Sequence, residues 1–440
     1  MKVAIVVGLG FGDEGKGAHV DFLTRRVKGP VTVVRFNGGA QAAHNVVTSD
    51  GRHHTFRQFG AGTFAGAYTY LSRFMLVNPV TLYLEAQLLR RLGVGEPLAK
   101  IFIDREALVT NPYQIAANRL MEAIRGEQRH GSCGMGIGET VADSIAHPEM
   151  TLRMEDLLNR EVLRKKLSFS HELKRAHFQS TGFSLNNPAW AAIVDTDMDF
   201  QVDRYSELGK LFQIVDRVRL EYLLFRPGTV IFEGAQGVLL DQDYGFHPYT
   251  TWSNTTFDNA LELLRDADYD CAEATRIGII RAYSTRHGAG PLPTEDAPEG
   301  IDGDVDNITN EYQQAFRIGA FDAVLARYAR QVVGHLDEVV VTNLDKVTTT
   351  QPRICTAYEF PSGVRLERLH VNASRPLNTG IQHKITEGLR QAKPVYRDLV
   401  SRRELVLAIN MVLKTPISFC SIGPTAAAKL TARQYIEINE

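Results

Sequence analysis

The chain begins with the stretch VAIVVGLGFGDEGKG, residues 3–17, in which an apolar run passes directly into a glycine-rich loop containing one lysine. Five consecutive apolar residues predict a buried strand, and the glycines allow a tight turn into a helix. Backbone amides of such a loop, with a nearby lysine, are typical of a phosphate-binding site. Asp13 and Glu14 would repel a phosphate unless a cation bridges them or a proton has to be removed.

Three interpretations of this loop compete. Gly10, Gly12 and Gly15 match the G-x-G-x-x-G pattern of dinucleotide-binding folds, but the second expected strand ends without an acid for a ribose hydroxyl. Gly10, Gly15 and Lys16 also match G-x-x-x-x-G-K, although Gly17 replaces the Ser or Thr that holds magnesium in an ordinary P-loop. A plain strand-to-helix turn explains the glycines but not the Asp-Glu-Gly-Lys core. A P-loop interpretation therefore requires a metal ligand from elsewhere in the chain, which Asp13 could supply.

Composition narrows the class of protein. The chain has 440 residues, 44% of them apolar, and its 49 Lys and Arg nearly balance its 51 Asp and Glu. No basic cluster with interleaved aromatic residues supports binding to nucleic acid or to a membrane surface. Four widely spaced cysteines favour a reducing compartment, and the first apolar run is too short for a signal or membrane segment. We expect a cytoplasmic globular protein.

Apolar strands alternate with amphipathic helices along the chain. The expected buried strands are VAIVV (3–7), VTVVRF (31–36), TVIFE (229–233), IGII (277–280), EVVVTNLD (338–345) and ISFCS (417–421). One helix should follow Asn78 as its cap, with Pro79 in its first turn and Gly93 as its stop, and another should cover residues 321–332. The pattern predicts the α/β class, with a large central, mostly parallel sheet flanked by helices. Without a repeat or a clear linker, we expect residues 1–440 to form one domain with inserted subdomains, and 291–306 to form a long loop.

A resemblance to a known family extends along most of the chain. GFGDEGKG (10–17) is followed by VVRFNGGAQAAHN (33–45), FEGAQGVLLDQDYGFHPYTTWSNTT (232–256), AYSTRHGAGPLPTE (282–295), TNLD (342–345) and SIGP (421–424). In this order the motifs resemble those of adenylosuccinate synthetases. The resemblance implies a P-loop-like, GTP-dependent ligase fold, a magnesium ion and a homodimer. It also implies that the 6-oxo group of inosine monophosphate (IMP) is phosphorylated and then displaced by the amine of aspartate.

The resemblance assigns catalytic roles that suit the residue types. Making a carbonyl oxygen attack a γ-phosphoryl group requires loss of the neighbouring N1 proton, for which a carboxylate in the loop is a suitable base. By resemblance this base is Asp13, which also binds magnesium together with the backbone carbonyl of Ala43. His44 stands where the family places its catalytic acid, and Gln236 is placed at the reacting base.

The resemblance also assigns binding residues. For GTP these are Gly12, Glu14, Gly15, Lys16, Gly17, Asn45, Asn343, Asp345, Ser421 and Gly423. For the substrates they are Asp13, Lys16, Gln41, Cys133, His147, Gln236, Thr251 and Arg317. Asp345 matches the acid that recognises the N1 and N2 donors of guanine and so prefers GTP to ATP.

Several positions depart from the family pattern. Asn343 replaces a lysine whose stem covers the guanine face, which should weaken base affinity or specificity. Cys133 replaces a phosphate-binding threonine, and His147 lies near the place of a partner-subunit arginine. Cys133 is interpreted as a small buried thiol in preference to a reactive nucleophile.

The largest departure lies at residues 307–319, which read NITNEYQQAFRIG. Members of the family have a Thr-Thr-Gly-Arg-x-Arg loop here that holds both carboxylates of aspartate. Arg317 alone could pair with one of them. Either the amine donor is not aspartate, or Arg281, Arg286 or His287 completes the clamp. Two alternatives to adenylosuccinate synthesis therefore remain: a paralogue with another amine or oxo substrate, and a GTP-binding regulatory protein without turnover.

Overall fold

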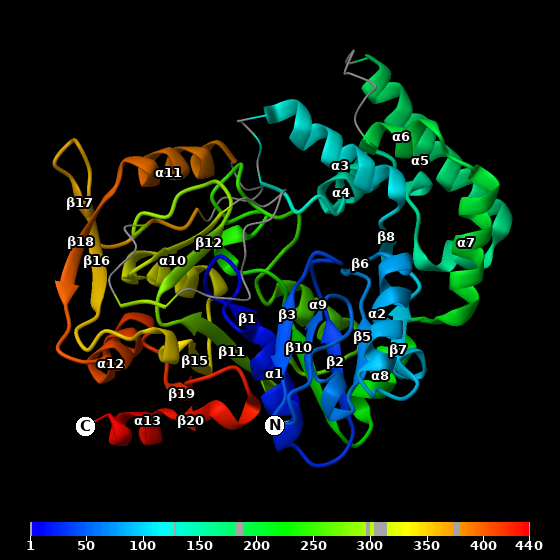
Figure 1. The fold of residues 1–440 in the computed structure, drawn as a ribbon. Coiled ribbons are helices and arrows are strands. Elements are labelled where there is room, and N and C mark those ends of the chain that lie inside the picture. The colour runs from blue at the N-terminus through cyan, green and yellow to red at the C-terminus, as the bar shows by residue number, and fades with distance from the viewer. Residues whose placement is uncertain are drawn as a thin grey trace.

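The computed structural model describes residues 2–126, 129, 131–180, 188–295, 300–302, 315–372 and 379–439. Within these residues ten strands form one sheet in the order β20-β19-β15-β11-β1-β10-β2-β5-β7-β9 (Figure 1). Neighbouring strands are parallel except for the antiparallel edge pair of β19 and β20. The predicted α/β class with a large, mostly parallel sheet is confirmed.

The strands of the central sheet are β1 (Val3–Gly8), β2 (Val31–Arg35), β5 (Tyr68–Leu71), β7 (Ile101–Asp104), β9 (Gln213–Val215), β10 (Thr229–Glu233), β11 (Ala274–Arg281), β15 (Glu338–Thr342), β19 (Ile417–Ser421) and β20 (Lys429–Thr431). The other strands are β3 (His44–Val47), β4 (His53–Phe56), β6 (Leu76–Val77), β8 (Leu108–Val109), β12 (Ser284–His287), β13 (Phe316–Gly319), β14 (Phe321–Asp322), β16 (Arg353–Glu359), β17 (Arg365–Leu366) and β18 (Lys393–Asp398). The helices are α1 (Lys16–Arg26), α2 (Pro79–Arg91), α3 (Pro112–Arg125), α4 (Ile137–Ala146), α5 (Arg160–Ser180), α6 (Pro188–Val194), α7 (Met198–Leu211), α8 (Val218–Phe225), α9 (Asp258–Asp266), α10 (Ala323–Val333), α11 (Thr379–Gln391), α12 (Arg402–Leu413) and α13 (Ala432–Ile438).

Both faces of the sheet are buried, which explains the unbroken apolar runs of its strands. In β1, the side chains of Val3, Ile5 and Val7 join a core with α8, α9, α10 and α12. Ala4 and Val6 point to the opposite face and join a second core with α1, α2 and α7. Successive side chains of a strand alternate between faces, so one apolar run supplies both cores of a three-layer arrangement.

Local signals set several boundaries. Helix α2 begins as predicted, because the side chain of Asn78 accepts a hydrogen bond from the Thr81 amide (3.1 Å) and Pro79 occupies the first turn. The strand predicted over 338–345 is too long, since β15 ends at Thr342. Asn343 takes a left-handed conformation (φ 57°) and turns the chain into a short 3-10 helix, η8 (Leu344–Lys346). An asparagine adopts this backbone more readily than most residues.

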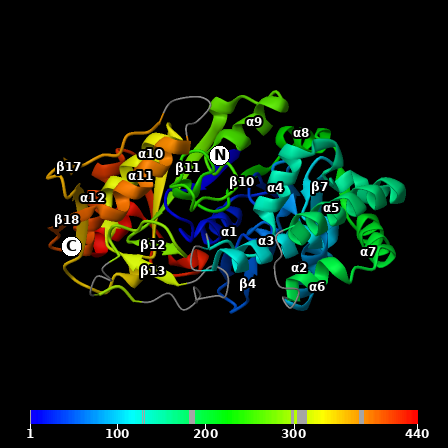
Figure 2. The same cartoon turned by 90° about the horizontal axis from the view of Figure 1, so that it is seen from above.

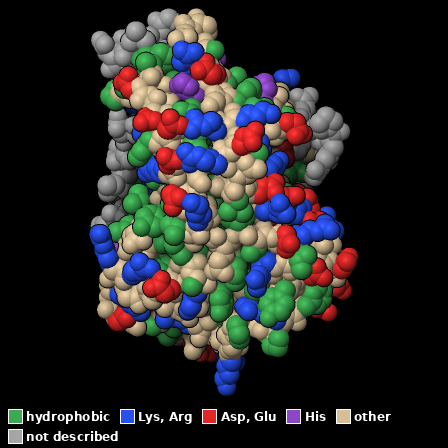
Figure 3. All heavy atoms as spheres, turned by 90° about the vertical axis from the view of Figure 1, so that its right-hand side faces the viewer, with side chains coloured by type: hydrophobic (Ala, Val, Ile, Leu, Met, Phe, Trp, Pro, Cys, Tyr) green, Lys and Arg blue, Asp and Glu red, His purple; other side chains and the backbone are tan. Residues whose placement is uncertain are grey.

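Two groups of elements are added to the sheet. Helices α3 to α7 lie together at one end of it, whereas α10, α11 and β16 to β18 lie toward the other (Figures 1 and 2). Acidic and basic side chains are interspersed over the face formed mainly by the first group (Figure 3).

Among the described helices, none is long and apolar enough to cross a bilayer. A single domain with inserted subdomains stays a prediction, and the expected loop at 291–306 lies partly outside the described residues.

Candidate active site

Most candidate residues gather at the carboxyl edge of the central sheet. They end or follow β19 (Ser421, Gly423), and they follow β15 (Asn343, Asp345), β1 (Gly12, Asp13, Glu14, Gly15, Lys16, Gly17), β10 (Gln236) and β2 (Gln41, Ala43, His44, Asn45). Strand β11, between β15 and β1, ends with Arg281. Because carboxyl ends of parallel strands share one edge, these loops converge, which is where open α/β sheets bind ligands.

The Glu14 side chain builds the glycine loop. Its Oε1 accepts hydrogen bonds from the amides of Gly10 (3.0 Å) and Gly12 (2.8 Å), and its Oε2 lies 2.6 Å from Nζ of Lys16. The side chain is buried, with Glu14 only 1% exposed. The acid that seemed out of place in a phosphate loop thus satisfies the loop's own donors, and its charge is balanced by Lys16.

The absence of a side chain at Gly17 allows the start of α1 to lie against β3. A Cβ atom added at Gly17 would lie 2.7 Å from Cβ of His44. Any side chain here, including the Ser or Thr of an ordinary P-loop, would displace His44. The close approach also brings His44 next to the glycine loop.

Asp13 lies in a left-handed conformation (φ 61°), and its side chain remains 24% exposed. Its Oδ2 lies 3.2 Å from Nε2 of His287, at the end of β12. Burial raises the pKa of Asp13, but the contact with His287 and the charges of Arg281 and Lys16 outweigh it, so the pKa lies below its ordinary value. Asp13 is therefore ionised at neutral pH, as a general base must be.

His44 is held by a buried carboxylate. Its Nδ1–H donates to Oε1 of Glu233, the last residue of β10, at 2.6 Å, and Oε2 of Glu233 accepts from the amide of Ala61 at 3.0 Å. Burial lowers the pKa of His44, whereas the charge of Glu233 acts in the opposite direction. Burial also disfavours the charge on Glu233, but His44 and Arg35 outweigh it and hold that pKa below its ordinary value. The contact fixes the imidazole ring and leaves Nε2 for another partner.

Two glutamines leave polar atoms for a ligand. Both amide atoms of Gln41 and Oε1 of Gln236 are buried without a hydrogen-bond partner among the described residues. The two side chains meet at the turn after β2, since a Cβ at Gly38 would lie 3.0 Å from Oε1 of Gln236 and one at Gly39 would lie 2.9 Å from Oε1 of Gln41. Unsatisfied buried amides are costly, so a polar molecule is expected to complete them.

Helix α4 reaches the same turn from the group at the end of the sheet. A Cβ at Gly39 would lie 2.6 Å from Cδ1 of Ile137, and one at Gly138 would lie 3.0 Å from the Trp252 ring. Trp252 adjoins Thr251, whose amide donates to the carbonyl of Leu240 at 2.8 Å. The start of α4 thus brings the segment of Cys133 near Gln41 and Thr251.

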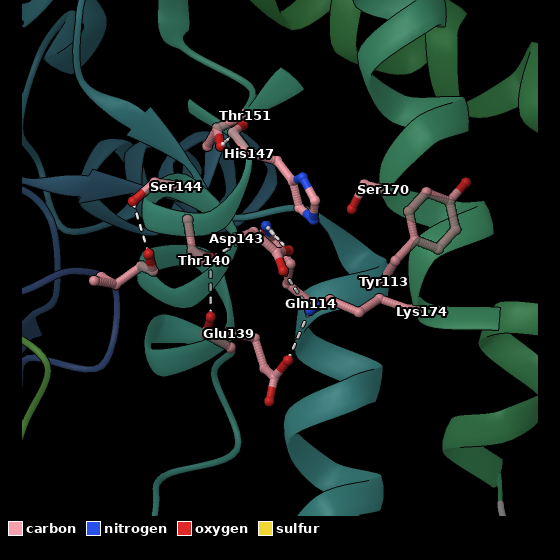
Figure 4. Close-up of polar contacts among 12 residues, drawn as sticks. Tyr113, Gln114, Glu139, Thr140, Asp143, Ser144, His147, Thr151, Ser170 and Lys174 are labelled. Atoms are coloured by element: carbon pink, nitrogen blue, oxygen red, sulfur yellow. Dashed lines mark hydrogen bonds and ion pairs between the residues drawn. The ribbon is translucent and has the colours of Figure 1, made fainter. Parts of the chain in front are cut away.

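A buried polar network fixes α4 in this position (Figure 4). Lys174 of α5 donates to Oε2 of Glu139 (2.8 Å) and to Oδ1 of Asp143 (2.6 Å). Gln114 of α3 donates to Oδ2 of Asp143 (2.9 Å). The network ties three helices together, and so orients the loop that precedes α4.

Cys133 and His147 are not poised for chemistry in this structure. Cys133 is half-buried and not the fully buried thiol expected from the sequence, but burial still raises the pKa of its thiol to about 11, which argues against a reactive nucleophile. His147 ends α4, and its ring lies edge-on to Phe169 with centroids 5.2 Å apart.

The glycine loop contacts β15, the strand that precedes Asn343 and Asp345. Oγ1 of Thr342, the last residue of β15, donates to the carbonyl of Glu14 at 2.7 Å. Thr425 forms an isolated parallel bridge with Val47 of β3, the strand that begins with His44. The side chain of Asn45 accepts from Thr55 within the β3–β4 hairpin (2.5 Å). Asp345 is exposed just after β15, where a ligand can reach it.

The arginines considered as partners for the carboxylates of aspartate already have hydrogen-bond or ion-pair partners within the protein. Arg286 is buried, and its guanidinium donates to the carbonyls of Ala289, Pro291 and Tyr249. It is therefore a structural residue. Arg317 pairs with Glu295 (2.5 Å) and donates to the carbonyl of Gly290, so it is available only if Glu295 releases it. Residues 307–314, where the sequence departs most from the family, lie outside the described residues.

Sequence reasoning missed Glu233, which holds His44, and did not predict that His287, a candidate for the amine clamp, contacts Asp13. An acid closing the apolar run TVIFE was a usable signal, because an ionisable residue at the end of a buried strand lies at the ligand-binding edge. The pairing of His287 depends on the β12–β13 hairpin and has no local signature.

The donor set suits magnesium bound together with a nucleotide. Mg²⁺ usually takes one or two carboxylates, keeps several waters and shares phosphate oxygens. The partly exposed carboxylate of Asp13 and the exposed Ala43 could supply protein oxygens of this kind. Within the described residues no cluster of three or more acidic, histidine or cysteine side chains forms an all-protein metal cage.

A parallel sheet whose carboxyl edge carries a glycine loop, an ionised aspartate and a carboxylate-bound histidine defines a nucleotide-dependent enzyme of the α/β class. A family model described as adenylosuccinate synthetase matches residues 5–430. The chain belongs to the adenylosuccinate synthetase family, and it is a GTP-dependent ligase that forms a carbon–nitrogen bond.

Relatives and solved structures agree with this placement. The chain is 32% identical to adenylosuccinate synthetase of Streptomyces griseus over 96% of this chain and 97% of that protein, and 30% identical to that of Mycobacterium tuberculosis over 99% of both. A fully ligated adenylosuccinate synthetase from Plasmodium falciparum has the same fold, with a TM-score of 0.80 and 20% identity over 98% of this chain and all of that one. Succinoaminodeoxyadenylate synthetase of cyanophage S-2L, solved with dGMP and dATP, is also similar (TM-score 0.60, 16% identity, 98% of this chain and 95% of that one).

Proposed function

We propose that the protein joins IMP to L-aspartate with GTP as phosphoryl donor, giving adenylosuccinate. The observation that carries this proposal is the placement of two groups beside one glycine loop: the ionised carboxylate of Asp13 and the imidazole of His44 held by Glu233. Asp13 belongs to this loop, and Gly17 in the same loop lies against His44, since an added Cβ there would lie 2.7 Å from Cβ of His44. Binding alone would require neither a base nor an acid.

The first half of the reaction uses Asp13. Its carboxylate removes the N1 proton of IMP, which makes the 6-oxo oxygen nucleophilic toward the γ-phosphoryl group. The contact with His287 orients this carboxylate. The unpartnered amide of Gln41 and Oε1 of Gln236 hold the IMP base, and Thr251 and Cys133 face its phosphate.

His44 acts on the phosphoryl group. In the structure the Nδ1–H is directed to Glu233, and burial keeps the pKa of His44 low. A polyanionic nucleotide beside the ring favours the imidazolium, so His44 takes up a proton on Nε2 as GTP binds. The protonated ring then donates to the bridging oxygen between the β- and γ-phosphates as charge develops there.

The remaining assignments concern GTP and its metal. Asp13 and the carbonyl of Ala43 would hold Mg²⁺, which would neutralise part of the phosphate charge. The loop Gly12–Gly17 and Asn45 surround the phosphates, while Asp345 and the Ser421–Gly423 turn contact the guanine. We further infer a homodimer in the cytoplasm, in which the segment of His147 faces the partner subunit; four unpaired cysteines fit that compartment.

The test is GTP consumption by the purified chain with defined substrates. We expect consumption that requires both IMP and aspartate, with adenylosuccinate as the purine product. Consumption with another nucleotide or amine would instead support a paralogue with different substrates. Tight GTP binding without turnover in every mixture would support a GTP-binding regulatory protein. The family relationship favours neither alternative.

We expect poor saturation with aspartate, since Arg317 is the one arginine carried over from the missing clamp and it is already paired with Glu295. Replacing Glu295 by glutamine should release Arg317 and lower the KM for aspartate about two- to tenfold, a range typical of one charge pair at a partly exposed site. Steady-state kinetics at saturating IMP and GTP measure this. A low aspartate KM in the unmodified chain, unchanged in Glu295→Gln, would contradict it.

A further inference from the structure

Lys429 is a buried lysine that the reaction described so far does not use. It begins β20, the edge strand of the central sheet, and it is 9% exposed. In the antiparallel pair of β19 and β20 it lies opposite Ser421, and its Nζ donates to Oγ of Ser421 at 2.6 Å. A lysine is rarely buried unless a charged or polar partner compensates for the loss of water, so the burial of Lys429 needs an explanation.

Its surroundings connect it to the end of the site that faces the base. Ser421 in turn donates to the carbonyl of Gly423 at 3.0 Å, so a chain of hydrogen bonds runs from the ammonium into the Ser421–Gly423 turn. The charges of Asp345, the exposed acid after β15, and of Asp21 on α1 both act to raise the pKa of Lys429. Ser421 is the one hydrogen-bond partner of Nζ recorded within the described part of the chain.

The ammonium remains charged under ordinary conditions. Burial lowers the pKa of Lys429 to about 8, while Asp345 and Asp21 oppose that effect, so the side chain is mostly protonated at neutral pH. Asp345 lies on η8, which contacts β19, and Asp21 lies on α1.

We propose that Lys429 positions the base-binding end of the site and sets its preference for guanine over adenine nucleotides. It does so by fixing the Ser421–Gly423 turn, which lies beside η8, where the Asp345 carboxylate can accept the N1–H and N2–H donors of guanine. Adenine offers no N1–H donor, so an adenine nucleotide gains little from this arrangement. This inference rests on the proposed assignment of GTP to that end of the site.

The test compares equilibrium binding of GTP and ATP to Lys429→Met, Lys429→Arg and Ser421→Ala, with Lys210→Met as a control. Lys210 is an exposed lysine of α7 paired with Glu207, far along the sequence from both base-contacting loops. Lys429→Met should weaken GTP binding at least about tenfold and ATP binding less than about twofold. Lys429→Arg should recover most of the preference, and Ser421→Ala should act in the same direction as Lys429→Met.

Turnover separates this role from a merely structural one. At saturating GTP, kcat and the KM for IMP should stay within about twofold in Lys429→Met, because neither reports on the base. A GTP-to-ATP binding ratio unchanged from the unmodified chain, in Lys429→Met or, if that variant does not fold, in Ser421→Ala, would overturn the proposal. Binding needs no turnover, so a failure of the ligase assignment would appear as absent product with the binding preference intact.

Discussion

Replacing Asp13 by asparagine is expected to lower kcat by about 10²–10⁴, the range that a positioned general base contributes, while GTP affinity stays within about tenfold. The carboxylate lies beside the glycine loop, is ionised and is contacted by His287, so its removal raises the barrier more than it changes ground-state binding. Asparagine is the sharper choice over alanine, because it also tolerates the left-handed backbone at this position (φ 61°) and keeps an oxygen for magnesium.

Stopped-flow or steady-state rates, with a fluorescent GTP analogue for affinity, measure the effect of Asp13→Asn. Asp203→Asn is the matched control, since Asp203 is an exposed acid of α7 paired with Arg160. The control should keep full activity. A fully active Asp13→Asn variant would show that Asp13 is not the general base, and it would contradict the mechanism proposed for the first half-reaction.

The central sheet and the start of α2 could be predicted because the sequence signals for them are local. The unbroken apolar runs of β1, β10 and β19 report burial on both faces, and Asn78 and Pro79 report the start of α2 through contacts within one turn. The position of the candidate residues at one edge follows from the parallel topology, which those runs also indicated.

Contacts between distant segments could not be predicted in the same way. Glu14 was expected to face GTP, and its assignment among the GTP-binding residues stays a prediction, yet its carboxylate folds inward onto Gly10, Gly12 and Lys16. The length of β15 was misjudged because Asn343 turns by a left-handed conformation that strand propensity does not reveal. Glu233 and His44 are 189 positions apart, and their contact depends on the pairing of β10 with β2.

That contact leads to the second large effect, which concerns His44. We expect His44→Asn to lower kcat by about 10²–10³, because the variant loses the donor at the developing charge between the phosphates. Glu233→Gln should cost less, about 10–10², since the imidazole remains but loses its orienting carboxylate. If Glu233 acts through His44, the double variant should be no slower than His44→Asn alone, whereas independent roles would multiply.

The pH profile gives a readout that a purely structural role would not move. The acid role requires the doubly protonated ring, so activity is present below the pKa of His44 in the complex and is lost as pH rises through it. Glu233 raises that pKa, against the lowering effect of burial, so Glu233→Gln should shift the alkaline limb of kcat to lower pH. Glu85→Gln is the matched control: Glu85 is also buried and accepts two backbone amides, but it contacts His54. An alkaline limb that stays in place in Glu233→Gln, or moves equally in Glu85→Gln, would show that Glu233 does not act through His44.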